Sequence, residues 1–468
     1  MKKNISYDSS LSTFVSLILD VLGREALTNN IFLRDAQGKL TFVVRDDIGH
    51  DIIETINDFA KVKMGAYVDP DFAVCSVDDI FDDELKNLQL SDNYTRKINI
   101  SAVVAVDVFY FERRVTGADW QRYFSSYSGP ARIVFSSIKG GVGRTTALCV
   151  VAASLSKAGK RVLAIDLDLE APGLGNMLLT PDTLPELGLL DYFVETNLNN
   201  FSFSELQELI GPSWLSEGRG RIDVIPALGK ASLKNPIDVI GKISRAYLTN
   251  VDPQNQVATF MDSLRNLLDS FDRNRYDVVL VDARSGLHET TAAALVGLGA
   301  DVFCFGVDQP QTLQGYELLF SAIASNKSAN NAKDSWLQNL HFVHAKAPLS
   351  QEKREQFSSN VENLAQKYFS HKLEEANLDK EILELRDSFE VIWTDSVYVE
   401  EQTDKVLKLG FDFNEVLVVL DDSSYREFDP LKDRDTLSDK VYNATFGSLV
   451  TKAKLLVEQA QVKVYADS

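Results

Sequence analysis

The spacing of hydrophobic residues changes near residue 131, and this change predicts two domains of different character. Near the N-terminus, apolar residues recur at helical spacing, and two apolar runs flank the turn-like segment 35–39, which predicts a β-hairpin. A second helix is predicted over 50–62 and a long apolar strand over 100–111. We therefore expect residues 1–130 to form a small α+β accessory domain, in which we find no catalytic motif.

From residue 131 onward, short apolar strands alternate with turns and helical patterns. Near-continuous runs of Val, Ile, Leu and Phe are typical of parallel strands buried on both faces, and the alternation with helices predicts a helical layer on each face. The predicted strands cover residues 132–136, 162–166, 222–226, 278–282, 302–307, 340–343 and 389–393. An amphipathic tail over 436–464 is predicted to pack on this sheet. The fold class expected for residues 131–468 is therefore α/β, with a mostly parallel sheet and helical insertions.

Composition and charge narrow the function classes. Of the 468 residues, 68 are Asp or Glu and 48 are Lys or Arg, for a net charge of −20. Binding of nucleic acid by the bulk surface is therefore disfavoured, although a local basic patch could still support it. The three cysteines are far apart, which argues against a disulfide framework or a zinc site and fits a reducing compartment. No apolar run reaches the ~20 residues that span a bilayer and no signal peptide is recognised, so we expect a cytoplasmic protein without a membrane span.

The first strand of the α/β region runs into a glycine-rich segment, KGGVGRTT at residues 139–146, and a helical pattern follows. Glycines let backbone N–H groups turn toward an anion, and the N-terminus of the next helix adds about half a positive charge. Thr145 stands where the hydroxyl group of a P-loop binds Mg²⁺. The common pattern GxxxxGK[ST] is broken twice, because Ile138 replaces the first glycine and Arg144 replaces the lysine.

KGGVGRTT resembles the deviant Walker A motif KGGxGK[ST] of the ParA/MinD family of P-loop ATPases, which belongs to the SIMIBI class. Its arginine resembles the KGGVGR-motif variant branch of that family, and the resemblance covers residues 131–460. It implies the α/β P-loop fold, with ATP and Mg²⁺ as cofactors. It also implies that the nucleotide is bound by Lys139, Gly140, Gly141, Val142, Gly143, Arg144, Thr145 and Thr146.

Lys139 matches the signature lysine of the family, which reaches across a two-fold interface to the nucleotide of the partner subunit. The resemblance therefore implies a homodimer that forms with ATP, and catalytic roles for Lys139 and Arg144. Arginine keeps the charge of the usual lysine but is longer, planar and forked. We therefore expect Mg-ATP to bind and to be hydrolysed slowly, with binding better supported than hydrolysis.

Acidic residues end two of the predicted strands. Asp166 and Asp168 follow one apolar strand, and alternation along a strand puts both carboxylates on one side, about 7 Å apart. By position in the family pattern, Asp166 helps to hold Mg²⁺ and Asp168 is the catalytic residue that orients the attacking water. Asp282 ends a Walker B strand, and the resemblance makes it the magnesium-linked carboxylate. From the residues alone, capping or a solvated strand end remains an alternative for Asp166 and Asp168.

Two loops and a later strand complete the predicted site. Residues 168–175 and 282–288 occupy the switch I and switch II positions of the family, and Arg284 departs from the family pattern in the second. His344 and Lys346 end a later strand near the place where relatives read the base, so both are candidate contacts of adenine. These residues do not distinguish ATP from GTP, and the resemblance favours ATP.

The leading hypothesis is a molecular switch that binds Mg-ATP, hydrolyses it slowly and dimerises on ATP. Such a switch docks an unidentified protein partner through loops that the nucleotide orders. The alternative is a non-hydrolysing, ATP-bound scaffold whose function resides in residues 1–130. Single-turnover hydrolysis, with Asp168→Ala as the control, separates the two.

Overall fold

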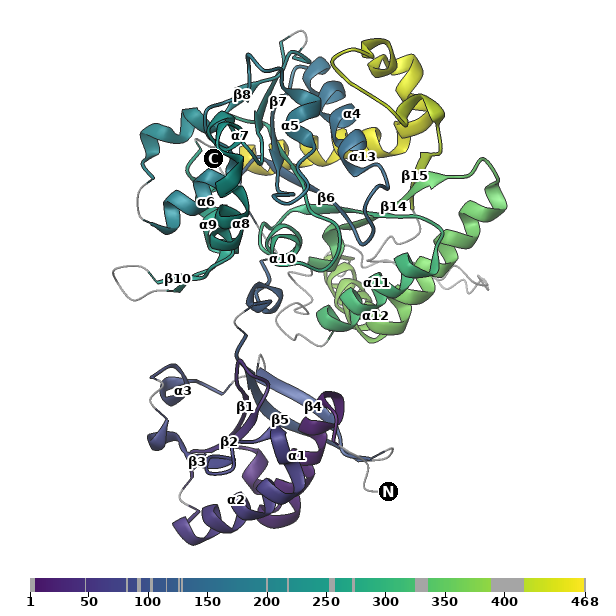
Figure 1. Cartoon of the computed structure of the whole chain (residues 1–468). Helices are drawn as coiled ribbons and strands as arrows, with labels where there is room; N and C mark the ends of the chain where they lie inside the picture. Colours follow the sequence, from purple (N-terminus) through teal and green to yellow (C-terminus); the bar gives the residue numbers. More distant parts are fainter. Residues whose placement is uncertain are drawn as a thin grey trace, which may run out of the picture. The chain divides into compact units, whose positions relative to one another are not determined.

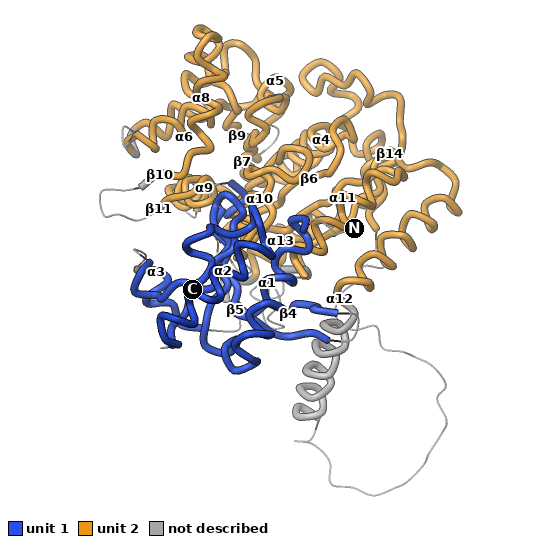
Figure 2. Tube along the Cα trace, turned by 60° about the horizontal axis from the view of Figure 1, so that its bottom comes forward, with its two compact units in different colours: residues 1–118, 325–328 blue, residues 119–324, 329–468 orange. Residues whose placement is uncertain are grey.

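The computed structural model divides the chain into two compact units, which Figure 2 colours separately. Among the described residues, the first unit ends at Ala118 and the second begins at Asp119. The described residues are 5–46, 48–80, 83–90, 94–101, 104–114, 116–124, 127, 129–198, 201–216, 219–251, 257–271, 274–324, 336–388 and 416–466.

The first unit is a five-stranded mixed sheet with the strand order β3-β2-β1-β5-β4. Neighbours β1 and β5 are parallel, whereas β1–β2 and β4–β5 are antiparallel pairs. Its elements are α1 (Tyr7–Leu22), β1 (Ile31–Arg34), β2 (Leu40–Val44), α2 (His50–Met64), β3 (Val74–Ser76), α3 (Asp83–Asn87), β4 (Thr95–Asn99) and β5 (Ala105–Glu112).

The hairpin and the second helix predicted for this unit are confirmed. The hairpin turns at Gly38, whose φ of 90° lies in the left-handed region that glycine adopts without strain. The strand predicted over 100–111 begins later, at Ala105, because the chain first turns back on itself after β4. The Ile100 N–H donates to the carbonyl of Val104 in this turn.

The second unit is built on an eight-stranded sheet with the order β15-β14-β13-β6-β12-β7-β9-β8. All neighbouring strands are parallel except the short pair β8–β9. The strands are β6 (Ala131–Ser137), β7 (Arg161–Asp166), β8 (Gly211–Pro212), β9 (Arg221–Ile225), β12 (Val278–Asp282), β13 (Asp301–Gly306), β14 (Leu340–Ala347) and β15 (Leu417–Leu420). The predicted strand 389–393 lies outside the described residues, and the edge strand β15 was missed.

Helices cover both faces of this sheet, as predicted (Figure 1). Along β6, Ile133 and Phe135 pack in the core with α4 and α13, whereas Val134 packs on the opposite face. The amphipathic tail forms α13 and packs on the sheet. The helices are α4 (Arg144–Lys157), α5 (Leu174–Leu178), α6 (Leu189–Asn197), α7 (Lys230–Lys234), α8 (Val239–Ala246), α9 (Phe260–Asp269), α10 (Glu289–Val296), α11 (Pro310–Ala324), α12 (Gln351–Ser388) and α13 (Asp439–Ala466); a small hairpin joins β10 (Asn250–Val251) and β11 (Val257–Ala258).

The segment just before β6 belongs to the second unit, although its sequence pattern was grouped with residues 1–130. Trp120, Tyr123 and Phe124 pack against the core of the second unit. The Phe124 N–H also donates to the carbonyl of Val296 over 2.8 Å. Within the described ranges, the structure contains no helix that is both long and apolar enough to cross a bilayer.

Candidate functional site

The glycine-rich segment forms a tight turn between β6 and α4. Gly141 and Gly143 have φ values of 72° and 95°, which side-chain-bearing residues rarely adopt. A Cβ atom added to Gly140 would lie 3.5 Å from the hydroxyl oxygen of Ser285, so the turn runs close to the loop after β12. Because α4 begins at Arg144, its free N–H groups and its dipole face the concave side of the turn. The local sequence therefore builds an anion cradle at the carboxyl end of β6.

Two aspartates lie beside this cradle on adjacent parallel strands. Asp282 ends β12 and Asp166 ends β7, and the two residues are register partners. Both are buried, with exposed fractions of 3% for Asp282 and 0% for Asp166. The Thr145 hydroxyl donates to Oδ2 of Asp282 over 2.5 Å. The other oxygen of Asp282, Oδ1, is buried and has no hydrogen-bond partner among the described residues. An orphaned carboxylate oxygen next to a hydroxyl group suits a hard cation such as Mg²⁺.

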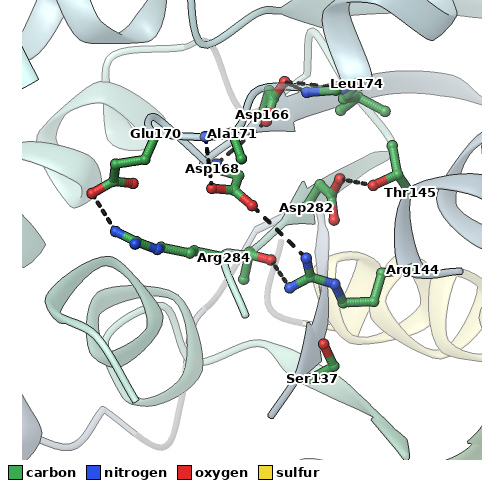
Figure 3. Close-up of polar contacts among 12 residues, drawn as sticks. Ser137, Arg144, Thr145, Asp166, Asp168, Glu170, Ala171, Leu174, Asp282 and Arg284 are labelled. Atoms are coloured by element: carbon green, nitrogen blue, oxygen red, sulfur yellow. Dashed lines mark hydrogen bonds and ion pairs between the residues drawn. The ribbon is translucent and has the colours of Figure 1, made fainter. Parts of the chain in front are cut away.

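The carboxylate of Asp166 holds the loop that follows β7. This role differs from the predicted one, in which Asp166 helps to hold Mg²⁺. The Oδ2 atom of Asp166 accepts the N–H groups of Gly173, Leu174 and Gly175 over 3.0–3.4 Å, and its Oδ1 accepts the N–H of Asp168 over 3.3 Å. Figure 3 shows this carboxylate directed at the start of α5. Both oxygens are therefore engaged by the backbone, and the capping interpretation of Asp166 describes this geometry.

Burial makes the charged forms of these carboxyl groups costly. It raises the pKa of Asp166 to about 8, with a further increase from the charge of Asp282, although the N–H groups that Asp166 accepts oppose this. Burial also raises the pKa of Asp282 to about 6, against the opposing effects of Arg144 and Thr145. The pKa of Asp168 is raised by burial and lowered by the positive charge of Arg144. A bound cation would favour the ionised form of all three.

Arg144 links the turn to both neighbouring loops (Figure 3). One terminal nitrogen donates to the carbonyl oxygen of Ala283, and the other lies 3.9 Å from a carboxylate oxygen of Asp168. The arginine is 8% exposed, so these contacts are shielded from water. A lysine has one terminal nitrogen in place of two, so it would meet the two partners with a different geometry. The departure from the usual lysine thus has a direct structural consequence.

A second cluster joins the two loops, and most of it was missed from the sequence. Arg284, in the loop after β12, forms an ion pair with Glu170, in the loop after β7. The Tyr247 hydroxyl also donates to Glu170, over 2.5 Å, and the Tyr247 ring lies 5.0 Å from that of His288. Arg284 was recognised as unusual, but neither Glu170 nor Tyr247 carries a local signal, because their contacts arise only in the folded chain.

Lys139 and Lys346 lie at the edge of the cradle, whereas His344 does not. The Lys139 ammonium donates to the side-chain oxygen of Gln309 over 2.6 Å. Lys346 lines a cleft of about 370 Å³ together with residues 141–146 of the turn. The expectation that His344 contacts the base is corrected: it is 1% exposed, and its ring stacks on Phe357 at 4.1 Å.

The far wall of this cleft was not foreseen. It is formed by the end of β15, the residues that follow it and the first half of α13, namely Val419, Leu420, Asp421, Asp422, Tyr425, Arg426, Thr445 and Phe446. The residues at and after β15 were missed because β15 itself was not predicted. The cleft places polar, charged and aromatic side chains beside the phosphate-type cradle, as a nucleotide site requires.

Residues 131–337 match a family model described as an AAA domain. The match spans less than half of the chain and ends before β14. The comparison with curated proteins gave no match.

Several solved structures are similar to about half of the chain. A plasmid partition protein from Borrelia burgdorferi is 19% identical, with 50% of this chain and 85% of that chain covered and a TM-score of 0.30. The cobyrinic acid a,c-diamide synthase of Mycobacterium smegmatis, solved with a bound ATP analog and magnesium, is 20% identical (50% and 82% covered, TM-score 0.35). The septum site-determining protein MinD of Pyrococcus horikoshii, complexed with Mg-ADP, is 18% identical (48% and 72% covered, TM-score 0.32).

Proposed function

We propose that the second unit binds Mg-ATP at the turn 139–146 and hydrolyses it slowly, as a nucleotide-dependent switch. One observation carries this proposal: the buried pair of Thr145 and Asp282 leaves a carboxylate oxygen that no described residue contacts by a hydrogen bond, directly beside a turn of backbone N–H groups. That arrangement combines an anion cradle with the ligand types that Mg²⁺ prefers. The match of residues 131–337 to an ATPase family model supports the same assignment.

In this proposal each group has a distinct task. Thr145 and Asp282 hold Mg²⁺, which neutralises phosphate charge when it is bound. Asp166 fixes the loop that carries Asp168, and Asp168 orients the attacking water. Arg144 lies 3.9 Å from Asp168, so it helps to hold this carboxylate in place as well as offering charge to the phosphates.

The same proposal includes an ATP-dependent homodimer and a protein partner. Lys139 stands at the exposed edge of the cradle, from which it can reach the nucleotide of a second copy. The Arg284–Glu170 ion pair joins the loops 168–175 and 282–288, and Tyr247 ties the pair to the segment after α8. A change at the phosphates would thereby reach a surface available to a partner.

A second candidate function is the non-hydrolysing, ATP-bound scaffold. The contacts of Arg144 favour it, because a guanidinium held by the Ala283 carbonyl and by Asp168 is not free to stabilise a transferring phosphoryl group. In that case the nucleotide has a structural role only.

Binding and single-turnover hydrolysis of ATP test both candidates on the full chain. The switch predicts Mg-dependent ATP binding that Thr145→Ala weakens, and slow hydrolysis that Asp168→Ala abolishes without loss of binding. It also predicts an ATP-induced doubling of mass that Lys139→Ala abolishes. Binding with equal, background hydrolysis in wild type and Asp168→Ala supports the scaffold, and absence of Mg-dependent binding refutes both.

A further inference from the structure

A cleft on the first unit has a positive lining, although the unit itself is acidic. The cleft has a volume of about 390 Å³, and residues of α1, β1, β4 and β5 line it. Residues 1–118 contain thirteen Lys or Arg and nineteen Asp or Glu, a net charge of −6. The cleft nevertheless gathers four basic and two acidic side chains, so that its net charge is +2: Arg34, Arg96, Lys97, Arg114, Asp8 and Glu112.

Arg34 is a fixed cation at the base of this cleft. It is only 3% exposed, and its guanidinium carbon lies 4.2 Å from the ring centre of Tyr7. Its Nε–H donates to the Tyr110 hydroxyl and its Nη1–H to the carbonyl of Gly38, over 3.0 and 2.9 Å. Its Nη2–H donates to the Ser10 hydroxyl over 3.0 Å. A guanidinium has five N–H groups, so Arg34 keeps donors for a ligand while its position is already set.

Two further cations line the cleft without an ion pair to any described residue. Arg96 and Lys97 lie on the edge strand β4, and neither forms an ion pair with any residue that the structure describes. Arg96 is held instead by the ring of Tyr110, whose centre lies 4.9 Å from its guanidinium carbon. Arg114, in contrast, is paired with Glu112 over 2.9 Å. In the register of β4 with β5, Asp107 lies opposite Lys97, so the positive charge without an acidic neighbour of this kind is that of Arg96, which lies opposite Val108.

The place of the cleft in the fold is one that suits a ligand. Arg34 and Glu112 are register partners at the carboxyl ends of the parallel strands β1 and β5. Open α/β sheets bind ligands beyond such strand ends. The first turn of α1, with Tyr7 and Asp8, lines the same cleft, and the helix dipole adds positive potential there.

We propose that this cleft binds a phosphate monoester, either a free small molecule or a phosphorylated side chain. A phosphate monoester carries a charge of about −1.5 to −2 at neutral pH, which complements the lining. Arginine forks bind phosphate oxygens in pairs, and the buried, prepositioned Arg34 reduces the entropy lost on binding. The inference is independent of the nucleotide site, because it rests on the first unit alone.

Hydrogen exchange on the full chain tests the proposal and localises the ligand. Mg-ADP is kept in excess so that it occupies the turn 139–146 and the probes do not bind there. The probes are inorganic phosphate, glycerol phosphate and a phosphoserine peptide. We expect protection of residues 5–12 and 104–114 at matched ionic strength. Protection by the free phosphates indicates a small-molecule ligand, and protection by the phosphopeptide alone indicates a protein ligand.

Two substitutions that are expected to change the affinity in opposite directions make the test decisive. Arg96→Ala is expected to weaken the apparent affinity about tenfold, because it removes one charge-assisted contact. Glu112→Gln is expected to strengthen it, because a repelling charge is lost while the hydrogen bonds of the side chain can be kept. The matched control Arg24→Ala removes an exposed arginine outside the cleft and should change nothing. Protection by chloride or by the unphosphorylated peptide, no protection by any probe, or equal effects of Arg96→Ala and Arg24→Ala overturns the proposal.

Discussion

Replacing Asp166 by asparagine is predicted to make the stability of the nucleotide-free chain less dependent on pH near neutrality. The pKa of Asp166 is raised from 3.8 to about 8 by burial and by the charge of Asp282. A raised pKa means that the folded state holds a proton that the unfolded state has released. The stability that this proton confers is present at low pH and is lost as the pH rises through about 8.

The size of the effect follows from this linkage. Between about pH 6.5 and 7.5 the folded state binds roughly one more proton than the unfolded state, so the free energy of unfolding falls by about 1.4 kcal/mol per pH unit. For a large domain this corresponds to a decrease in Tm of about 2–4 °C. Asp166→Asn removes this decrease. The variant also loses roughly 1 kcal/mol at every pH, because the asparagine NH₂ group cannot accept the N–H of Asp168.

Thermal unfolding of the full chain, followed across this pH range without nucleotide, measures the prediction. The informative quantity is the difference between the pH slopes of wild type and Asp166→Asn, since groups that do not interact with Asp166 titrate equally in both. Asp182→Asn is the matched control, because Asp182 is exposed and lies away from the strand ends. If wild type and Asp166→Asn have the same slope, the buried carboxyl pair does not behave as argued, and the case for a cation site beside it fails with it.

Three further substitutions probe the contacts described above. Arg144→Lys should lower the free energy of unfolding by about 1–2 kcal/mol in urea titrations, because one terminal nitrogen replaces the two separate nitrogens that meet the carbonyl and the carboxylate; an unchanged midpoint contradicts this. Glu170→Gln keeps an acceptor for Tyr247 but removes the ion pair with Arg284, so amide exchange over residues 168–175 should rise about fivefold, for a loss of about 1 kcal/mol. Phe320→Ala, in a fully buried aromatic cluster, should cost about 3–5 kcal/mol in calorimetry without altering the site, and a smaller loss would mean that the core relaxes around the cavity.

Features with a local physical cause could be predicted from the sequence. The turn after β6 needs positive φ values, and Gly141 and Gly143 stand at those positions. Buried strands can be recognised in the sequence as apolar runs. The ends of β7 and β12 were therefore located correctly, together with Asp166 and Asp282. The amphipathic pattern of the tail likewise predicted α13 and its packing.

Features that depend on distant residues could not be predicted in this way. The role of Asp166 as an anchor requires the N–H groups of the loop to turn back toward it, which the pattern of residue types does not encode. His344 and Lys346 were both candidate contacts of the base, because both end a strand near the place where relatives bind it. The register of β14 with β15 instead shifts after His344, and Lys346 adopts a φ of 49°, so the alternation breaks and only Lys346 reaches the cleft.

The positive charges of the two arginines in the site are both balanced by carboxylates, and this balance bears on how a switch could work. Arg144 and Arg284 both lie near carboxylates of the loop after β7, where Asp168 and Glu170 balance their charge in the nucleotide-free chain (Figure 3). A bound triphosphate would bring negative charge to the same place and compete for the guanidinium of Arg144. On the proposed function, binding therefore exchanges partners rather than simply adding a contact, and Asp168 is freed or held according to the state of the nucleotide. A lysine at position 144 would enter the same exchange with one terminal nitrogen in place of two, which gives the arginine a reason to be there.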